Sequence, residues 1–424
     1  MSASNLKTVA INLAVLAILY IALASVFFLI NSRNETGGGA ARGTLTANTI
    51  RSTYPNYSSY EPRKALEFFV EYSAPKTGYQ PFVGYRRAAF SGGSVTIDKE
   101  FGFRTSTNHA VSQSIWFLGG STMWGTGSPD EATIPSLVAQ QTGERVLNLG
   151  ESGYTSFQEL VQLQLLLAKG YRPKRVVFYD GVNDGYFNCQ KGEPIPTHAY
   201  RARFSEMLEN YSELKQRADK NVEAILGNAS TLEWVSVKLK GSGRWIGTFL
   251  KSPFAYFLPE SNDTDKGLAA ATPFSRITKS KTYLHCHDPD LARVVARTMV
   301  TVWLQAHTLL KGIGIPVTFV LQPAATYEPE EYMLDYIVDS VKQNIVDESD
   351  SYREFYRAVK AEWASRCEEQ AACSDFLDLS AAFRGSNIPI FIDTCHVSPN
   401  GNRIIAERMA TAAGLKAATT PGGR

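Results

Sequence analysis

Apolar runs of strand length alternate with amphipathic stretches along most of the chain from about residue 112. The stretch around 156–169 places Phe157, Leu160, Val161 and Leu163 at helical spacing. We predict strands at 114–118, 145–150, 175–180, 317–321 and 376–379, and helices at about 131–142, 156–169, 288–312, 328–366 and from Gly401 onward. Alternation of this kind predicts parallel strands joined by helical crossovers, which is an α/β fold.

The alternation stops between about 186 and 288, where the chain shows short amphipathic helices and no clear strand. We interpret this stretch as an insertion, either a cap over a site or a passive decoration. Upstream, within the lead-in at 61–110, Val95–Asp98 alternates like a strand.

The N-terminal region predicts a membrane anchor. Thr8 to Ile30 carries no charge, and about 20 apolar residues suffice to span a bilayer. The apolar run continues beyond a cleavage-like Ala22-Leu-Ala24, which favours an uncleaved helix over a signal peptide. We therefore divide the chain into an anchor at 1–31, a flexible tether at 32–60, a main domain at 61–415 and a disordered tail at 416–424.

The orientation of the anchor rests on the cysteines, because the few basic residues on either side of the span are nearly balanced. Cys367 and Cys373 enclose a short loop that an oxidising compartment would lock. We expect the main domain on the exterior or periplasmic side. The count of five cysteines leaves one thiol over, and Cys189 has two equal candidates as its partner, Cys286 and Cys395.

Composition changes this picture little. The chain is 44% hydrophobic and 20% charged, with a formal net charge of +2, as in ordinary globular proteins. This balance gives no electrostatic reason to expect nucleic acid as a partner.

Candidate chemistry begins at Ser121, which follows the apolar run Ile115–Leu118 and the pair Gly119-Gly120. A serine on such a turn stands at the carboxyl end of a strand, where open α/β sheets bind ligands. Asp393 and His396 are three residues apart near the C-terminus, close enough for the carboxylate to orient the imidazole. A serine, a base and an orienting acid are what nucleophilic ester cleavage requires.

Three donors could stabilise an oxyanion: the backbone N–H groups of Ser121 and Gly153, and the side-chain amide of Asn183. Each follows a predicted parallel strand, so the fold would gather them at one edge of the sheet.

These residues lie in four blocks: Phe117-Leu-Gly-Gly-Ser-Thr122, Asn148-Leu-Gly-Glu-Ser-Gly153, Gly181-Val-Asn-Asp184 and Asp393-Thr-Cys-His396. In this order the blocks resemble those of the SGNH (GDSL-type) hydrolases, over roughly 80–410. The resemblance implies a flavodoxin-like three-layer α/β/α fold and hydrolysis or transfer of acyl esters. It also implies Ser121, Asp393 and His396 as catalytic residues, Ser121, Gly153 and Asn183 as the oxyanion hole, and neither metal nor cofactor. One departure is that Gly120 stands where the family has aspartate.

The resemblance and the expected location together predict a membrane-anchored serine esterase whose substrate is an acylated small molecule or glycan, with O-acetyl as the expected acyl group. The alternatives are an O-acyltransferase that modifies an exported polysaccharide and a catalytically silent carbohydrate-binding relative.

Other residues allow competing interpretations. His285-Cys-His-Asp288 has metal-ligand residue types, but a loop or a cystine is the simpler reading. Glu151 and Asp184 are a candidate carboxylate pair for glycoside chemistry, or hydrogen-bonded loop acids. Trp124 and Tyr154 are candidates for the wall of a sugar or acyl pocket, although core packing is the usual role of such rings.

Overall fold

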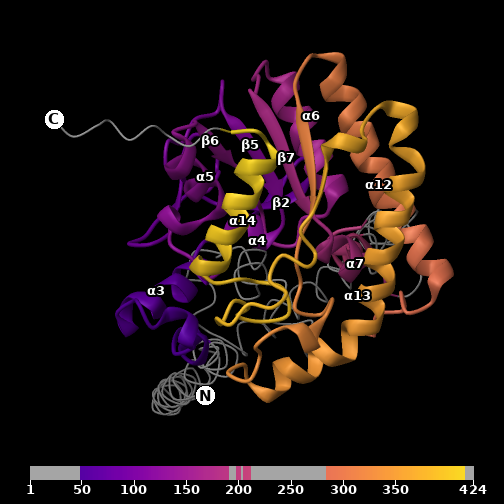
Figure 1. Ribbon diagram of the computed structural model, residues 1–424. Helices are drawn as coiled ribbons and strands as arrows, with labels where there is room; N and C mark the ends of the chain where they lie inside the picture. Colours follow the sequence, from indigo (N-terminus) through magenta and orange to yellow (C-terminus); the bar gives the residue numbers. More distant parts are fainter. Residues whose placement is uncertain (1–47, 191–196, 202–203, 212–282, 416–424) are drawn as a thin grey trace, which may run out of the picture. The chain divides into compact units, whose positions relative to one another are not determined.

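The computed structural model describes residues 48–190, 197–201, 204–211 and 283–415 (Figure 1). The chain divides into two compact units, residues 1–45 with 202–267 and residues 46–201 with 268–424. The described part of the first unit is the helical stretch 204–211. The second unit contains the sheet and every element named below.

The central sheet has five parallel strands in the order β6-β5-β7-β8-β9. They are β5 (Ile115–Gly119), β6 (Val146–Asn148), β7 (Arg175–Asp180), β8 (Val317–Leu321) and β9 (Phe376–Asp378). Counted along the chain this is the order 2-1-3-4-5, which is that of flavodoxin-like sheets. The predicted parallel α/β fold is therefore confirmed, and β7 and β8 occupy the predicted ranges.

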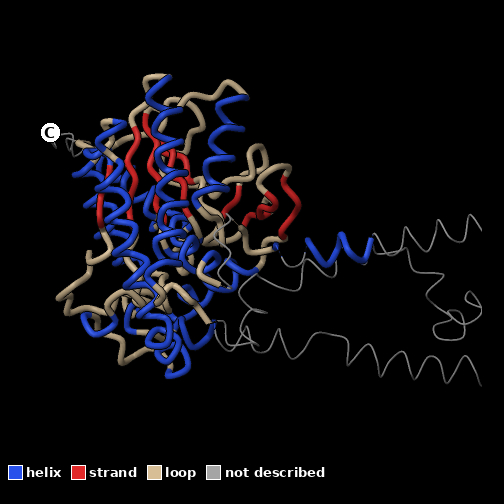
Figure 2. Tube along the Cα trace, turned by 90° about the vertical axis from the view of Figure 1, so that its right-hand side faces the viewer, coloured by secondary structure: helices blue, strands red, loops and turns tan. Residues whose placement is uncertain are grey.

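Helices cover both faces of the sheet (Figures 1 and 2). Because successive strand residues point to opposite faces, Trp116 and Leu118 pack in one core, while Ile115 and Phe117 pack in another. The first core is shared with α6 (Ser156–Ala168), α12 (Pro289–Gly312) and α13 (Asp339–Arg366), and the second with α5 (Ile134–Thr142) and α14 (Pro399–Ala412). Burial on both faces explains why the strands read as continuous apolar runs.

Local sequence fixes where the main helices begin. Thr133 and Asp288 cap α5 and α12 by accepting from backbone N–H groups, and Thr155 with Gln158 forms a capping box on α6. Pro399 occupies the first position of α14, where its fixed φ suits a helix. Other helices are α3 (Pro62–Ser73), α4 (Ser121–Trp124) and α7 (Val182–Asn188), and there are 3₁₀ turns at η1 (Pro55–Tyr57), η2 (Asp130–Ala132), η3 (Pro329–Glu331), η4 (Glu368–Gln370) and η5 (Cys373–Asp375).

The segment before the sheet holds elements that the sequence pattern did not predict. Helix α3 and a hairpin of β1 (Thr77–Gln80) and β2 (Gly84–Arg87) precede the two-residue pair β3 (Phe90–Ser91) and β4 (Thr96–Ile97). Only β4 falls within a predicted strand.

The predicted tether is wrong in its last part. Residues 48–60 form helical turns that pack on the domain, with Tyr54, Asn56 and Tyr57 buried. The error has a physical cause. The aromatic residues of this stretch show neither helical nor strand spacing, but their side chains can still pack into the core of the neighbouring domain.

No helix within the described ranges is long and apolar enough to cross a membrane. The predicted span Thr8–Ile30 lies outside those ranges, as do most of the tether, the tail and much of the insertion.

The cysteine question is settled by two disulfides. Cys189 pairs with Cys286 and Cys367 with Cys373, while Cys395 is a buried free thiol. Of the two partners open to Cys189, Cys286 is therefore the one used.

Candidate functional site

Ser121 lies directly after β5, as the first residue of the single-turn helix α4. Gly125 ends that turn with φ of +97°, a left-handed conformation suited to glycine. The Ser121 side chain is buried, and its Oγ lies 2.7 Å from Nε2 of His396. The hydroxyl is thus presented at the carboxyl end of the sheet, within hydrogen-bond distance of an imidazole.

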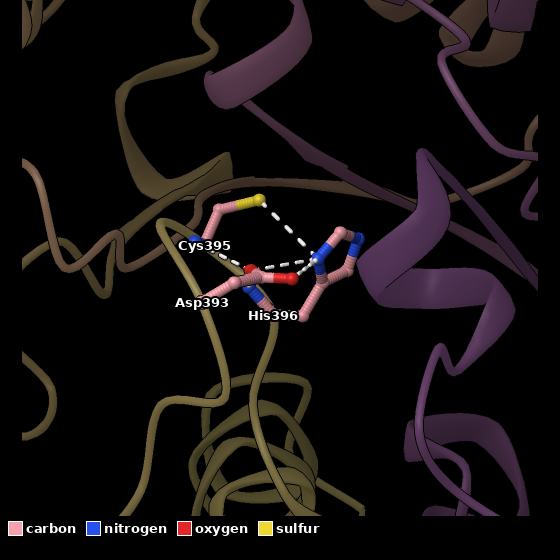
Figure 3. A group of neighbouring side chains, drawn as sticks. All are labelled: Asp393, Cys395 and His396. Carbon is pink, nitrogen blue, oxygen red and sulfur yellow. Dashed lines mark hydrogen bonds and ion pairs between the residues drawn. The ribbon is translucent and has the colours of Figure 1, made fainter. Parts of the chain in front are cut away.

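His396 is supplied by the loop between β9 and α14. This loop is closed by a bridge between Phe391 and Val397 and by a bond from the Ile392 N–H to the His396 carbonyl. Nδ1 of His396 lies 2.8 Å from each carboxylate oxygen of Asp393 (Figure 3). The three-residue spacing that the sequence suggested therefore does bring the acid and the imidazole together.

Backbone donors hold the Asp393 carboxylate in place. Its Oδ1 accepts from the N–H groups of Cys395 at 3.1 Å and His396 at 2.9 Å. Burial raises the pKa of Asp393, but His396 and then Arg51 lower it more, so the pKa lies well below its ordinary value. The acid is ionised throughout the range in which proteins are folded.

The same contacts act on the imidazole in the opposite sense. Burial lowers the pKa of His396, but the Asp393 carboxylate and then Cys395 raise it more, to well above its ordinary value. The Asp393 carboxylate therefore stabilises the imidazolium that forms when His396 takes a proton from a serine.

Asn183 lies in α7, directly after β7, and Gly153 lies in the loop that follows β6. The Asn183 amide donates to the Tyr154 carbonyl at 2.7 Å, which ties α7 to the loop that carries Gly153. A Cβ on Gly120 would lie 2.2 Å from Nδ2 of Asn183, so this amide is in close contact with the residue that precedes Ser121.

Three buried acids lie beneath this edge of the sheet. Asp184 accepts from both the N–H and the hydroxyl of Ser156, and Asp180 accepts from Nε1 of Trp303 at 2.7 Å. Burial, aided by Asp184, raises the pKa of Asp180 to about 8, and burial raises that of Asp184 to about 6. Burial and the neighbouring Asp180 raise the pKa of Glu159 well above its usual range.

These raised pKa values predict a pH-dependent stability. The folded protein keeps protons that the unfolded chain releases above about pH 4, so stability falls as pH rises toward the folded pKa values. Glu159→Gln keeps the shape of the side chain but cannot ionise. At pH 8 we expect its free energy of unfolding to exceed that of the wild type by about 1 kcal/mol or more. Urea unfolding between about pH 5 and 9 measures this, with Glu407→Gln, a change at an exposed residue, as the control. An unchanged dependence on pH would contradict it.

Glu151 is engaged elsewhere. Its carboxylate forms a buried ion pair with Arg87 at 2.5 Å and also accepts from the Arg87 backbone N–H. With Asp184 bound to Ser156, neither carboxylate of the suggested glycoside pair is free of structural bonds. The contacts favour the alternative of hydrogen-bonded acids, although Asp184 lies in the first turn of α7 and not in a loop.

The two aromatic residues singled out from the sequence are packing residues. Trp124 is buried with the guanidinium groups of Arg87 and Arg104 over its ring, at 4.4 and 4.2 Å. Tyr154 is equally buried, against Tyr85. Neither presents a ring face as the wall of a pocket.

The His285–Asp288 motif is accounted for without a metal role. Cys286 is consumed by its disulfide, and Asp288 caps α12. In the described part of the chain, the one group of potential ligand atoms is Asp393, Cys395 and His396, whose atoms lie within 4.8 Å of one another. The Cys395 sulfur lies 3.8 Å from Nδ1 of His396, a nitrogen already bonded to Asp393.

Three residues near the site were missed by the sequence reasoning. Arg51 forms an ion pair with Asp393, Arg87 binds Glu151 and Ser152, and the Tyr72 hydroxyl lies 3.0 Å from the Ser152 hydroxyl. All three come from the segment before the sheet, where no strand-helix alternation marks them. The pattern of apolar and polar residues in a single sequence does not show which arginines are buried.

Comparisons with known proteins point to one family. Residues 117–255 match the model of the GDSL-like Lipase/Acylhydrolase family. That range includes Ser121, Gly153 and Asn183, and ends before Asp393 and His396. No match was found among curated proteins.

The solved structures similar to this chain have low sequence identity. One is described as a lipolytic protein of the G-D-S-L family, from Desulfitobacterium hafniense DCB-2, with 10% identity, a TM-score of 0.35, and coverage of 71% of this chain and 99% of that chain. Another is a catalytic mutant of Axe2, an acetylxylan esterase from Geobacillus stearothermophilus, with 14% identity, a TM-score of 0.32, and coverage of 72% and 97%.

Proposed function

We propose, because residues 117–255 match the model of the GDSL-like Lipase/Acylhydrolase family, that the protein is a membrane-anchored serine esterase that removes short acyl groups, O-acetyl above all, from carbohydrate. One observation carries the chemistry. The Ser121 hydroxyl, the His396 imidazole and the Asp393 carboxylate form a chain with successive distances of 2.7 and 2.8 Å.

The proposed reaction passes through an acyl-enzyme. Ser121 Oγ attacks the ester carbonyl carbon while Nε2 of His396 takes the hydroxyl proton. The same proton is then given to the departing alcohol, which leaves the acyl group bonded to Ser121. His396 then takes a proton from a water molecule, whose oxygen attacks the acyl carbon, and returns the proton to Ser121 Oγ as the ester bond breaks and the carboxylic acid leaves. Asp393 holds the imidazole with Nε2 toward Ser121 throughout.

The negative oxygen of the tetrahedral intermediate would be bound by the N–H groups of Ser121 and Gly153 and by the Asn183 amide. An amide carries two N–H donors, and the bond from Asn183 to the Tyr154 carbonyl occupies one of them. The same bond fixes the amide, so that the second donor is oriented before the substrate arrives.

One feature supports a small acyl group. Ser121 is only 3% exposed, and Gly120 is in close contact with Asn183, so the space for an acyl chain is small. The exterior location is supported by the two disulfides, which persist in oxidising compartments, and the anchor by the apolar run at Thr8–Ile30.

A fluorophosphonate probe and a substrate panel test the proposal. We expect the probe to label Ser121, as located by mass spectrometry of the digested protein. We also expect faster turnover of p-nitrophenyl acetate than of the octanoate, and release of acetate from O-acetylated glycans. Adding a free sugar acceptor separates hydrolysis from transfer, because a transferase would move the acetyl group to the acceptor. Absence of labelling on the folded protein would refute the serine mechanism.

The close contact at Gly120 gives a separate prediction about the oxyanion hole. A Cβ at this position would overlap Asn183 Nδ2, which is held by the Tyr154 carbonyl and must be displaced. We expect Gly120→Ala to lower kcat by about 10²-fold, the effect of losing one oxyanion donor. Gly312→Ala is the matched control, because a Cβ there meets nothing within 4 Å. A wild-type kcat in Gly120→Ala would remove Asn183 from the oxyanion hole.

A further inference from the structure

The N-terminal end of the described chain reaches the catalytic acid. Nη2 of Arg51 lies 3.4 Å from Oδ2 of Asp393, although the two residues come from opposite ends of the sequence. The Arg51 side chain is 30% exposed and that of Asp393 10%, so the pair is partly shielded from water. Arg51 lies in the helical stretch 48–52, within the range predicted from sequence to be a tether.

The segment that carries Arg51 is fixed to the same loop by other contacts. The Asn56 amide donates to the Phe391 carbonyl at 3.3 Å, and the Tyr336 hydroxyl donates to that carbonyl at 2.6 Å. Tyr54 packs edge-to-face on Tyr336, with ring centroids 5.5 Å apart. The guanidinium is thus delivered by a docked segment and not by a long side chain free at the surface.

The second oxygen of Asp393 has few partners. Oδ1 accepts from the backbone N–H groups of Cys395 and His396, in addition to its contact with Nδ1. In the described ranges, Oδ2 contacts Nδ1 of His396 and Nη2 of Arg51. The guanidinium therefore occupies the side of the carboxylate that the loop itself leaves open.

We propose that Arg51 is a positioning residue of the active site, whose guanidinium holds the Asp393 carboxylate and partly offsets its charge, so that the His396 imidazole is not locked in its protonated form. The inference rests on the proposed function, because only a base that must accept a proton from Ser121 gains from this offset. It also makes the docked segment after the predicted tether a part of the catalytic apparatus.

The electrostatics around the pair agree with this role. Groups from four elements face the Asp393–His396 pair: Cys395 from the same loop, Arg51 and Tyr57 from the docked segment, Tyr72 from α3 and Ser121 from α4. Arg51 is the cation among these groups, and it lowers the pKa of Asp393. Removing it leaves the carboxylate charge uncompensated, which stabilises the imidazolium and raises the pKa of His396 further.

The test is the pH dependence of kcat/KM for p-nitrophenyl acetate, measured on the full-length protein. On the acid side of its pH profile, kcat/KM falls as the base of the free enzyme becomes protonated. We expect Arg51→Gln to move this acid limb to higher pH by about 0.5 to 1 unit. Arg51→Lys retains the positive charge and should restore the limb. Arg63→Gln, an exposed arginine on the nearby α3, should match the wild type.

A purely structural role for Arg51 predicts another result. A loosened loop would lower the rate at every pH and leave the limb in place, and that outcome, or superimposable profiles, would overturn the proposal. The pKa of His396, followed through the NMR signal of its Cε1–H, tests the same claim without turnover. If the wild type neither turns over the ester nor reacts with a fluorophosphonate, the proposed function fails, whereas an unshifted His396 pKa in Arg51→Gln refutes the role of Arg51 alone.

Discussion

Ser121→Ala is expected to abolish hydrolysis of p-nitrophenyl acetate, with a fall in kcat of about 10⁴-fold or more. The hydroxyl is the attacking atom in the proposed reaction, and it lies 2.7 Å from Nε2 of His396. The fold should persist, because the change removes one side-chain hydrogen bond, which contributes about 1 kcal/mol to stability.

The control for this variant is a serine in the segment that leads into β5. Ser112 is exposed before β5, so Ser112→Ala should keep wild-type turnover. Thermal unfolding, followed by circular dichroism, checks that both variants are folded. Unchanged turnover in folded Ser121→Ala protein would take Ser121 out of the reaction.

Asp393→Asn is expected to lower kcat by about 10²- to 10⁴-fold. The neutral amide no longer fixes the tautomer in which Nδ1 carries the proton, and it leaves Arg51 facing an uncharged group. The pKa of His396 should fall, because the carboxylate is the group that raises it. The acid limb of kcat/KM should therefore move to lower pH, opposite in sign to the shift expected for Arg51→Gln.

The chain contains a matched control for this pair. Asp375 lies 3.3 Å from Nε2 of the buried His307, away from Ser121 in another His–Asp contact. Asp375→Asn should retain the wild-type rate. A near-wild-type rate in Asp393→Asn would instead mean that another group orients His396.

Much of the fold could be predicted because the strands of a parallel sheet are buried on both faces. Val317–Leu321 is apolar apart from one threonine and is bounded by a Gly-Ile-Pro turn, so its limits are visible in the sequence. Ser121, Asp393 and His396 could be predicted because each stands at a strand end or within one short loop. The order of the strands, in contrast, follows from packing between distant residues.

The parts that were missed depend on contacts between remote segments. The strand β1 has one half-buried and three exposed residues, so it shows no alternation to detect. The partner of Cys189 could not be chosen, because spacing along the chain does not determine distance in space. Arg51 gives no sign of its position beside Asp393, since that position follows from how Tyr54 and Asn56 dock.

The Cys189–Cys286 disulfide has a consequence for how the enzyme can diversify. It joins residues 97 positions apart, and the His285 N–H also donates to the Cys189 carbonyl at 2.9 Å. The disulfide therefore joins the end of α7 covalently to the segment that precedes α12. If the sequence between the two cysteines changed in length, this bond would still hold its two ends together, so the reacting groups would keep their places.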